Sequence, residues 1–447
     1  MTESISEKLA SAIARAEEPP REIVEKLLID VAGLCVAARN TDYVRAALAG
    51  WEASGKCTAI GHARALDSGG AAFVNGTAAH GEDFDDTFEG GPIHAGAVIV
   101  PAVLALCERE KIPGERALRG IAVGVELTCR ASLVAPKLIH KAGFHPTAVL
   151  GAMGAAAAAG TVLNLNKPEF VNALGIAGSM ASGIIEYLAE GTWTKRMHPG
   201  WAAQSGIRAA DLARGGFTGP RTVFEGEHGL YHGFARTTSG NWDKLLEGFG
   251  SRWVTSTIAF KLYPCGTMTH PYIDCARRLA KKVDFESIEE IVCEAAEGTL
   301  HRLWEPLAAK QRPPNAYAGK FSTPYCIAAG FVLGNTGLDA FTDERVADPR
   351  LRALAAKVRY EVDPDNPYPN EYTGHVRVRM RDGSMVEERQ PYLRGGAHEP
   401  LSRGDLEDKF RNNCAHGGWG RGQAENFLKW AQGAFDAPSI DLTAFRK

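Results

Sequence analysis

The densest group of potentially catalytic side chains lies in residues 81–96, between glycine and proline residues. Loops that carry acids and a histidine beside rigid elements are common sites of catalysis. We expect this stretch to supply a carboxylate, a hydroxyl and an imidazole to a pocket. The candidates are Asp83, Thr87 and His94, whereas Asp85 and Asp86 are as readily explained as residues that cap and brace the loop.

A calcium site is one alternative, because the spacing of the acidic residues superficially resembles the start of an EF-hand loop. The pattern fails where Phe88 replaces the required glycine and His94 replaces the bidentate glutamate. A solvated, helix-capping acidic turn remains a second alternative. Three carboxylates so close together cannot all be ionised and buried without cations. We therefore expect some of them to face solvent or to pair with basic residues, and we predict no metal.

A second candidate is His145, which is followed by Pro146 and an apolar run. Proline suits the first position of a helix, so His145 should lie near the N-cap. The positive end of the helix dipole disfavours protonation there, and a neutral imidazole can act as a general base. A capping histidine without chemistry is the alternative.

The third group of candidates lies in residues 191–200. Its basic residues, Lys195, Arg196 and His198, precede a helix expected from Ala202. Binding a carboxylate is a natural use of such a group. A solvated basic turn is the alternative.

Two further segments carry candidates in the second half of the chain. Lys261 lies between Phe260 and Leu262-Tyr263, where it could be partly desolvated, and His270 follows nine residues later. Cys265 lacks a predictable base beside it, so a nucleophilic role is not favoured. Tyr325 opens a later helix and supplies a phenol.

Apolar residues at helical spacing dominate the chain up to about residue 255, and no alternating strand pattern competes with them. The first half is therefore predicted to be all-helical. The expected helices are 20–39, 97–107, 114–132, 146–163, 167–188 and 202–215, with a short one at 69–79.

After Pro264 the pattern changes to α+β. Strands are expected at 288–295 and 358–362, and a hairpin at 375–389, in which Asp382-Gly383 makes the turn. Helices are expected between them, and residues 402–433 return to helix. The predicted fold is mainly α: a large helical domain from residues 1–262 and 396–447, and a smaller inserted α+β domain, residues 263–395. The helices expected within this α+β domain are 271–283, 323–334 and 345–357.

Composition narrows the class of protein. A net charge of -3 over 447 residues leaves no electrostatic footprint for nucleic acid or an anionic membrane. The nine cysteines form no C-x-x-C pair, which argues against a zinc ribbon, and they suggest a reducing compartment. The N-terminus lacks a secretory pattern, and the longest uncharged run is mostly Ala and Gly. We expect a cytoplasmic protein.

Taken in order, several short segments resemble the MmgE/PrpD family. They are Asn75–His80, Asp83–Thr87, His94, Gly143–Pro146, Thr194–Gly200, Phe260–Cys265 with Thr269-His270, and Phe321–Tyr325. Each motif is weak alone, but six in this order are specific, and the likeness extends over nearly the whole chain. The family includes 2-methylcitrate dehydratase, cis-aconitate decarboxylase and iminodisuccinate epimerase.

The resemblance implies a homodimer with an α+β lid on a helical domain and a cofactor-free pocket at their junction. The residues implied to line that pocket are Asp83, Thr87, His94, His145, Lys195, Lys261 and Tyr325. His198 and His270 fall in matching segments and are implied substrate-binding residues.

These family reactions share the handling of a proton on carbon next to a carboxylate. Our hypothesis is that cations bind a di- or tricarboxylate, and that His145 or His94 moves the proton. Asp83 would orient or charge a histidine, and Thr87 would donate a hydrogen bond. The cations of this scheme are Lys195, Arg196 and Lys261.

Two departures affect the expected reaction. Decarboxylase members carry a histidine where Cys265 and Gly266 stand here, and the insertion of residues 89–92 differs from the dehydratases. A dehydratase-type lyase is therefore the leading prediction, although its substrate need not be 2-methylcitrate. An epimerase is the next alternative, then a decarboxylase. A non-catalytic carboxylate-binding dimer is less favoured because ionisable groups are so dense.

Overall fold

The computed structural model describes residues 2–91, 93–334 and 336–447. Pro92, the last residue of the insertion noted above, lies outside the described residues. The chain forms two compact units. The first unit comprises Met1–Gly81, Asp85–Ile258 and Ser402–Lys447, and the second comprises Glu82–Phe84 and Ala259–Leu401. The predicted fold class, mainly helical with a smaller α+β part, is confirmed.

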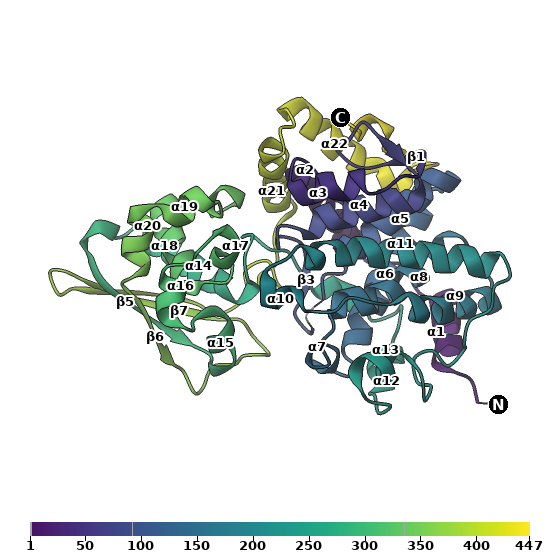
Figure 1. Ribbon diagram of the computed structural model, residues 1–447, viewed down its shortest axis with the longest axis horizontal. Coiled ribbons are helices and arrows are strands. Elements are labelled where there is room, and N and C mark those ends of the chain that lie inside the picture. Colours follow the sequence, from purple (N-terminus) through teal and green to yellow (C-terminus); the bar gives the residue numbers. More distant parts are fainter. Residues whose placement is uncertain (1, 92, 335) are drawn as a thin grey trace. The chain divides into compact units, whose positions relative to one another are not determined.

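The first unit is a bundle of helices drawn from both ends of the chain (Figure 1). Its helices are α1 (Ile5–Ala14), α2 (Arg21–Ala38), α3 (Asp42–Ala49), α4 (Ser68–His80), α5 (Gly96–Glu110), α6 (Gly114–Ser132), α7 (Leu138–Lys141), α8 (Pro146–Val162), α9 (Lys167–Met180), α10 (Tyr187–Glu190), α11 (Thr194–Arg214), α12 (Leu230–Ala235), α13 (Trp242–Leu246), α21 (Arg403–His416) and α22 (Arg421–Gly433).

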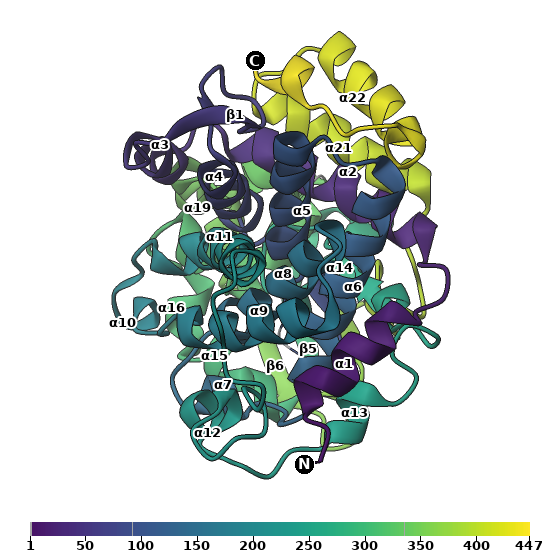
Figure 2. The same ribbon diagram turned by 90° about the vertical axis from the view of Figure 1, so that its right-hand side faces the viewer.

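The centre of this unit is a stack of small-residue helices, in which α11 packs on both α4 and α8, and α8 packs on α6 (Figure 2). Glycines allow the backbones of α4 and α11 to approach closely. A Cβ on Gly200 would stand 2.1 Å from the carbonyl oxygen of Phe73, and one on Gly76 would stand 2.6 Å from Cα of Gly200. This contact fixes the two helices that carry His80 and His198.

The expectation of an all-helical first half is wrong in one respect. Strands β1 (Ser54–Thr58) and β2 (Ala65–Leu66) form a short antiparallel pair, and β3 (Thr87–Phe88) and β4 (Ile258–Ala259) are two-residue strands. A five-residue strand with a bulge shows too little alternation to be recognised in the sequence.

The helix predicted over 167–188 is also wrong, since α9 ends at Met180. Ala181 is extended with ψ 141°, and Gly183 takes a φ of +114° that only glycine adopts readily. The resulting bend lies against the start of α8 and, as described below, positions His145.

The helix predicted from Ala202 begins earlier, at Thr194. Pro199 lies inside it, although proline lacks the N–H that would bond the carbonyl of Lys195. The basic residues Lys195, Arg196 and His198 thus lie in the first two turns of α11.

The second unit contains a four-stranded sheet in the order β6-β5-β7-β8. Its strands are β5 (Ile288–Ala295), β6 (Val358–Val362), β7 (Gly374–Met380) and β8 (Met385–Gln390). The predicted hairpin joins β7 to β8, with Gly383 at φ +85°. β5 pairs in parallel with β6 and antiparallel with β7.

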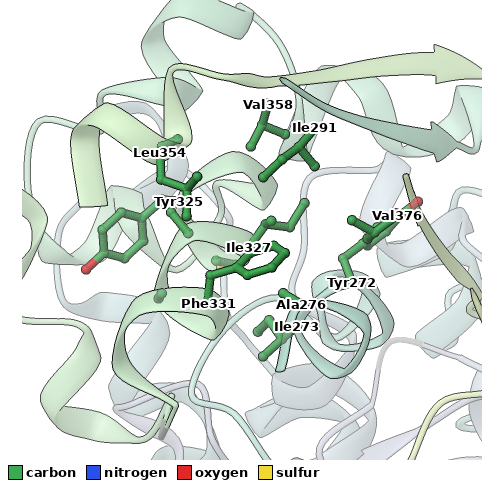
Figure 3. Packing of buried hydrophobic residues seen from close by; sticks show 14 of the residues in the cluster. Tyr272, Ile273, Ala276, Ile291, Tyr325, Ile327, Phe331, Leu354, Val358 and Val376 are labelled. Carbon is green, nitrogen blue, oxygen red and sulfur yellow. The ribbon is translucent and has the colours of Figure 1, made fainter. Parts of the chain in front are cut away.

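Helices cover the apolar face of this sheet, with α14 on β7 and β8 and α18 behind α14. Figure 3 shows the resulting core, where Ile273, Ile291, Ile327 and Val376 pack together. The helices of the unit are α14 (His270–Leu279), α15 (Leu300–Leu303), α16 (Leu307–Gln311), α17 (Ala316–Gly319), α18 (Thr323–Leu333), α19 (Asp343–Ala347) and α20 (Pro349–Ala355).

All nine cysteines are buried free thiols. Within the described ranges, every helix is too short or too polar to cross a bilayer.

Candidate active site

Four histidines from separate segments meet inside the first unit. The ring centroid of His80 lies 4.9 Å from that of His94 and 5.6 Å from that of His145, and the centroids of His145 and His198 are 5.3 Å apart. His80, His145 and His198 are all buried, and His94 is partly exposed. The structure therefore brings together three predicted site residues and one that was not predicted.

The bend after α9 holds His145 in place. Its backbone N–H donates to the carbonyl of Gly183 at 2.8 Å, and the N–H of Ile185 donates to the carbonyl of Gly143 at 3.0 Å. His145 is the N-cap of α8 and Pro146 is the first helical residue. The predicted N-cap position of His145 is therefore confirmed.

Nδ1 of His145 lies 3.1 Å from Nδ1 of His198. Burial, followed by the fields of His80, His198, Lys195 and His94, holds the pKa of His145 well below its ordinary value. Burial and the charges of His80 and Lys195 lower the pKa of His198 to about 4. Both rings are therefore neutral near pH 7.

Two neutral rings joined in this way take opposite tautomers, because each carries a single hydrogen. The ring that donates through Nδ1 leaves Nε2 as a free base. The ring that accepts at Nδ1 carries its hydrogen on Nε2. The pair thus presents one basic nitrogen and one N–H donor.

His94 is fixed by two contacts. Its backbone N–H donates to Oγ1 of Thr147, at the start of α8, at 3.2 Å. Its Nδ1 lies 2.8 Å from the carbonyl oxygen of Asp86, which can only accept, so Nδ1 carries the hydrogen. Nε2 of His94 is therefore the basic nitrogen of that ring.

Asp85 lies between two of the histidines. Its Oδ2 accepts from Nδ1 of His80 at 2.7 Å, and its Oδ1 lies 3.6 Å from Nδ1 of His94. The three side chains are close enough together to hold a metal ion. In this arrangement Nδ1 of each histidine donates a hydrogen bond, so direct hydrogen bonds hold the three side chains together.

Of the two alternatives expected for the aspartates of the acidic loop, exposure to solvent and pairing with basic residues, the first is not observed. Asp83, Asp85 and Asp86 are all buried. Burial, followed by the charge of Asp85, raises the pKa of Asp86 to about 8, so this carboxyl is neutral near pH 7. Its Oδ2 accepts the N–H of Gly96 at 3.0 Å and braces the start of α5.

Thr87 is the remaining predicted residue of this loop. It forms the short strand β3 with Phe88, and it is buried. Its predicted hydrogen bond to substrate stays a prediction.

A pocket of about 610 Å³ opens beside His198, between α8 and α11 and the bend after α9. Its walls are mainly apolar, and Thr194 and Glu186 add polar groups. The lining residues include Ala148 and Ala152 of α8, Met197 and Trp201 of α11, and Tyr187 of α10.

The two cations of α11 differ in their surroundings. Lys195 is half-buried, and its positive charge acts on both His145 and His198. The guanidinium of Arg196 instead lies 4.4 Å from the ring centre of Tyr43, a cation–π contact. Lys195 is thus the better candidate to hold a substrate carboxylate.

The other predicted residues lie in the second unit. Nζ of Lys261 donates to the carbonyl oxygen of Asp83 at 2.9 Å, and both residues are buried. Asp83 takes a φ of +55°, which is uncommon outside glycine. The short segment Glu82–Phe84 is thus tied to the second unit through its backbone, and no sequence pattern indicated that.

Tyr325 and His270 are both buried in this unit. The hydroxyl of Tyr325 donates to the carbonyl of Ala340 at 2.5 Å, and its ring belongs to the core shown in Figure 3. The ring of His270 packs 5.1 Å from that of Tyr263. Their predicted roles in substrate binding stay predictions.

His80 was not among the predicted site residues, and Asp85 was predicted only as a residue that could cap and brace the loop. The available signal was a histidine at the end of an expected helix with an aspartate five residues later. Only the fold shows that the chain turns between them, so that the two side chains meet.

Comparison with known proteins identifies the family of this chain. The MmgE/PrpD N-terminal domain matches residues 4–242 and the MmgE/PrpD C-terminal domain matches residues 263–429. Cis-aconitate decarboxylase from Homo sapiens is 32% identical over 77% of this chain and 72% of its own length. Cis-aconitate decarboxylase from Aspergillus terreus is 29% identical over 88% of this chain and 86% of its own length.

Decarboxylases of this kind break a carbon–carbon bond without water or an oxidant, which makes them lyases. The chain is accordingly an enzyme of the lyase type, and it belongs to the MmgE/PrpD family.

Proposed function

We propose that this enzyme is a cofactor-independent lyase that moves a proton on carbon next to a carboxylate of a small di- or tricarboxylate. The observation that carries the proposal is the neutral pair of His145 and His198, with Nδ1 atoms 3.1 Å apart beside a pocket. A hydrogen on carbon beside a carboxylate is weakly acidic, so its removal needs a positioned neutral base.

Different residues of the first unit act as base, as acid and as the group that binds the carboxylate. The basic nitrogen of the histidine pair, or Nε2 of His94, removes or returns the proton. The remaining N–H serves as the acid. Lys195 holds a carboxylate and offsets the negative charge that develops on the carbon.

Two reactions fit this scheme. Dehydration of the 2-methylcitrate type uses the base on carbon and the acid on the departing hydroxyl. The residues Cys265 and Gly266, at the place where decarboxylases carry a histidine, favour it. Decarboxylation of the cis-aconitate type uses the acid alone to protonate carbon as carbon dioxide leaves, and the relatives favour it.

A substrate panel followed by NMR in deuterated water distinguishes these reactions. The purified enzyme is incubated with cis-aconitate, 2-methylcitrate, citrate and iminodisuccinate. We expect one tricarboxylate to lose water or carbon dioxide. Exchange at carbon without net loss would indicate an epimerase instead. A ligand-induced rise in Tm without exchange or turnover would indicate a carboxylate-binding protein and would overturn the proposal.

We also propose that the enzyme is a homodimer. Exposed apolar side chains gather near the pocket: Ile184 is 61% exposed, Leu188 53%, Trp193 49% and Trp201 40%. Trp201 packs edge-on against Phe73. Several large apolar side chains exposed within one short stretch of the chain are typical of a protein interface. Light scattering of Trp201→Glu should show a larger monomer fraction than wild type.

We assign the enzyme to the cytoplasm, because nine free buried thiols suit a reducing compartment.

A further inference from the structure

The pocket beside His198 is poorly suited to a carboxylate, although the proposed substrate carries two or three of them. Among its lining residues in the described part of the chain, none is a lysine or an arginine, and two, Glu186 and Glu190, are acidic. An anionic group in this pocket would meet apolar surface and like charge, which costs free energy. The pocket therefore fits a part of the substrate that carries no negative charge.

The pocket lies between one face of α8 and one face of α11. On α8 the face consists of Ala148 and Ala152, which are one helical turn apart and both buried. His198 belongs to the face of α11, and its Nδ1 lies 3.1 Å from Nδ1 of His145. The pocket thus begins at the histidine pair to which we assign the proton transfer. The lining residues of α11 follow one another at helical spacing: Thr194, Met197, His198 and Trp201.

Gly183 keeps the His198 end of the pocket open. A Cβ at this position would stand 3.4 Å from Nδ1 of His198 and 2.5 Å from Cβ of Ala148. The φ of Gly183, +114°, also disfavours any residue that has a side chain. A group attached to a carbon held at His198 can therefore extend into the pocket past Gly183 and Ala148.

The size of the pocket sets the size of that group. Its volume is about 610 Å³. Pockets of about 300–1,000 Å³ take ligands of drug size, so this one has more room than the carbon skeleton of citrate or aconitate needs. Apolar walls stabilise a ligand in proportion to the apolar surface that it buries. The substituent that matches both the volume and the walls is an alkyl chain.

We propose that the substrate is a di- or tricarboxylate with an alkyl arm next to the reacting carbon, and that this arm occupies the pocket. Ala152 and Met197, on opposite walls, are then specificity-determining residues. The reaction of such a substrate rests on the proposed function, whereas binding of the arm needs no turnover. Ile184 and Trp201 line the pocket too, but we assign both to the dimer interface, so the test uses the other two residues.

Calorimetry on the full-length enzyme tests the pocket with unreactive probes: succinate and its methyl, propyl and hexyl derivatives. Each added methylene should lower Kd by about two- to fourfold, because it buries apolar surface. Equally weak binding along the series, or none, would overturn the proposal. Tighter binding of aminohexylsuccinate than of hexylsuccinate would also overturn it, because Glu186 and Glu190 would then assign the pocket to a cationic arm.

Ala152→Leu is the variant that fills the pocket, because it adds an isopropyl group to the inner wall. It should weaken the binding of hexylsuccinate by about tenfold more than that of succinate. Ala415→Leu, at an exposed position on α21, is the matched control and should leave both affinities unchanged. Equal weakening of the two probes in folded Ala152→Leu would contradict the proposal.

Met197→Gln provides a second variant, because it keeps the size of the side chain but makes the wall polar. It should weaken hexylsuccinate by about three- to tenfold more than succinate. Unchanged binding of hexylsuccinate to both Ala152→Leu and Met197→Gln would place the arm elsewhere and overturn the proposal.

The same order should appear in catalysis. The kcat/KM of wild type should rise from citrate to its 2-methyl, 2-propyl and 2-hexyl derivatives, and Ala152→Leu should reverse the order. A kcat/KM that falls along the series in wild type would contradict the proposal. If the probes bind in the expected order but no polycarboxylate is turned over, the proposed function fails and the assignment of the pocket stands.

Discussion

Nδ1 of His145 and Nδ1 of His198 lie 3.1 Å apart, and this contact makes the two neutral rings adopt opposite tautomers. One ring therefore offers a basic nitrogen and the other an N–H donor, without any change of net charge. Acid–base chemistry on carbon needs such a pair within reach of one substrate. The bend at Gly183 and the close contact of α4 with α11 hold the two rings in place.

Lys195 and Arg196 are adjacent but should differ in function. Lys195→Met should lower kcat/KM by about 10- to 100-fold, because a charge-assisted contact to a substrate carboxylate is lost. Arg196→Met should change kcat/KM little, since the guanidinium packs on Tyr43. Steady-state kinetics on both variants checks this. A larger loss in Arg196→Met would reverse the assignment.

The buried carboxyl of Asp86 predicts a stability that falls with rising pH. The folded chain keeps this proton up to about pH 8, whereas an unfolded aspartate releases it near 3.8. The folded state thus binds more protons across that window, so the free energy of unfolding contributed by Asp86 decreases as the pH rises through it.

Asp86→Asn should remove that penalty while keeping an acceptor for Gly96. We expect its Tm to exceed that of wild type by a few degrees at pH 8 and to be similar to it near pH 4. Melting curves across this range measure the difference. A variant that is less stable than wild type at pH 8 would show that the carboxyl is ionised in the folded protein.

The ion pair of Asp30 and Lys409 ties the N-terminal helix α2 to the C-terminal helix α21. The charged atoms are 2.7 Å apart and both side chains are buried. Lys409→Met should destabilise the fold by about 3–5 kcal/mol, because it leaves a buried carboxylate without its partner. Denaturant unfolding measures this change.

An exposed pair provides the control for that experiment. Arg45 and Asp42 form an ion pair whose side chains are 62% and 71% exposed. Arg45→Met should change the free energy of unfolding by no more than about 0.5 kcal/mol. Equal effects of the two substitutions would show that burial of the Asp30–Lys409 pair contributes nothing.

Gly200→Ala tests the packing that carries His198. The added methyl would meet the carbonyl of Phe73 at 2.1 Å, so α11 must move away from α4. We expect a loss of about 1–3 kcal/mol in stability together with reduced kcat. Gly422→Ala on α22 is the control, because its methyl meets open space, and it should be neutral or stabilising. Wild-type stability in Gly200→Ala would contradict the packing argument.

Local sequence signals predicted much of the helical framework. The helix predicted over Gly114–Ser132 has those bounds, since glycine and proline mark its start and the apolar face is continuous. The hairpin with Gly383 and the N-cap position of His145 were also predictable. Each depends on neighbours a few residues apart, which is the range over which turn and capping rules operate.

Features that depend on distant contacts were not predictable. The bend at Gly183 interrupts a run of good helix formers because it pairs with Gly143 and His145. The parallel pairing of β5 with β6 joins segments more than sixty residues apart. His80 was overlooked for a different reason: Asp85 follows it by only five residues, but nothing in the sequence shows that the chain turns between them so that the two side chains meet.

Membership of His145 in the acid–base machinery is best measured by kcat/KM of His145→Asn on the tricarboxylate that wild type turns over. We expect a loss of about 10²- to 10⁴-fold, with the fold intact by circular dichroism and His232→Asn unchanged. Turnover of His145→Asn within the error of wild type would contradict it.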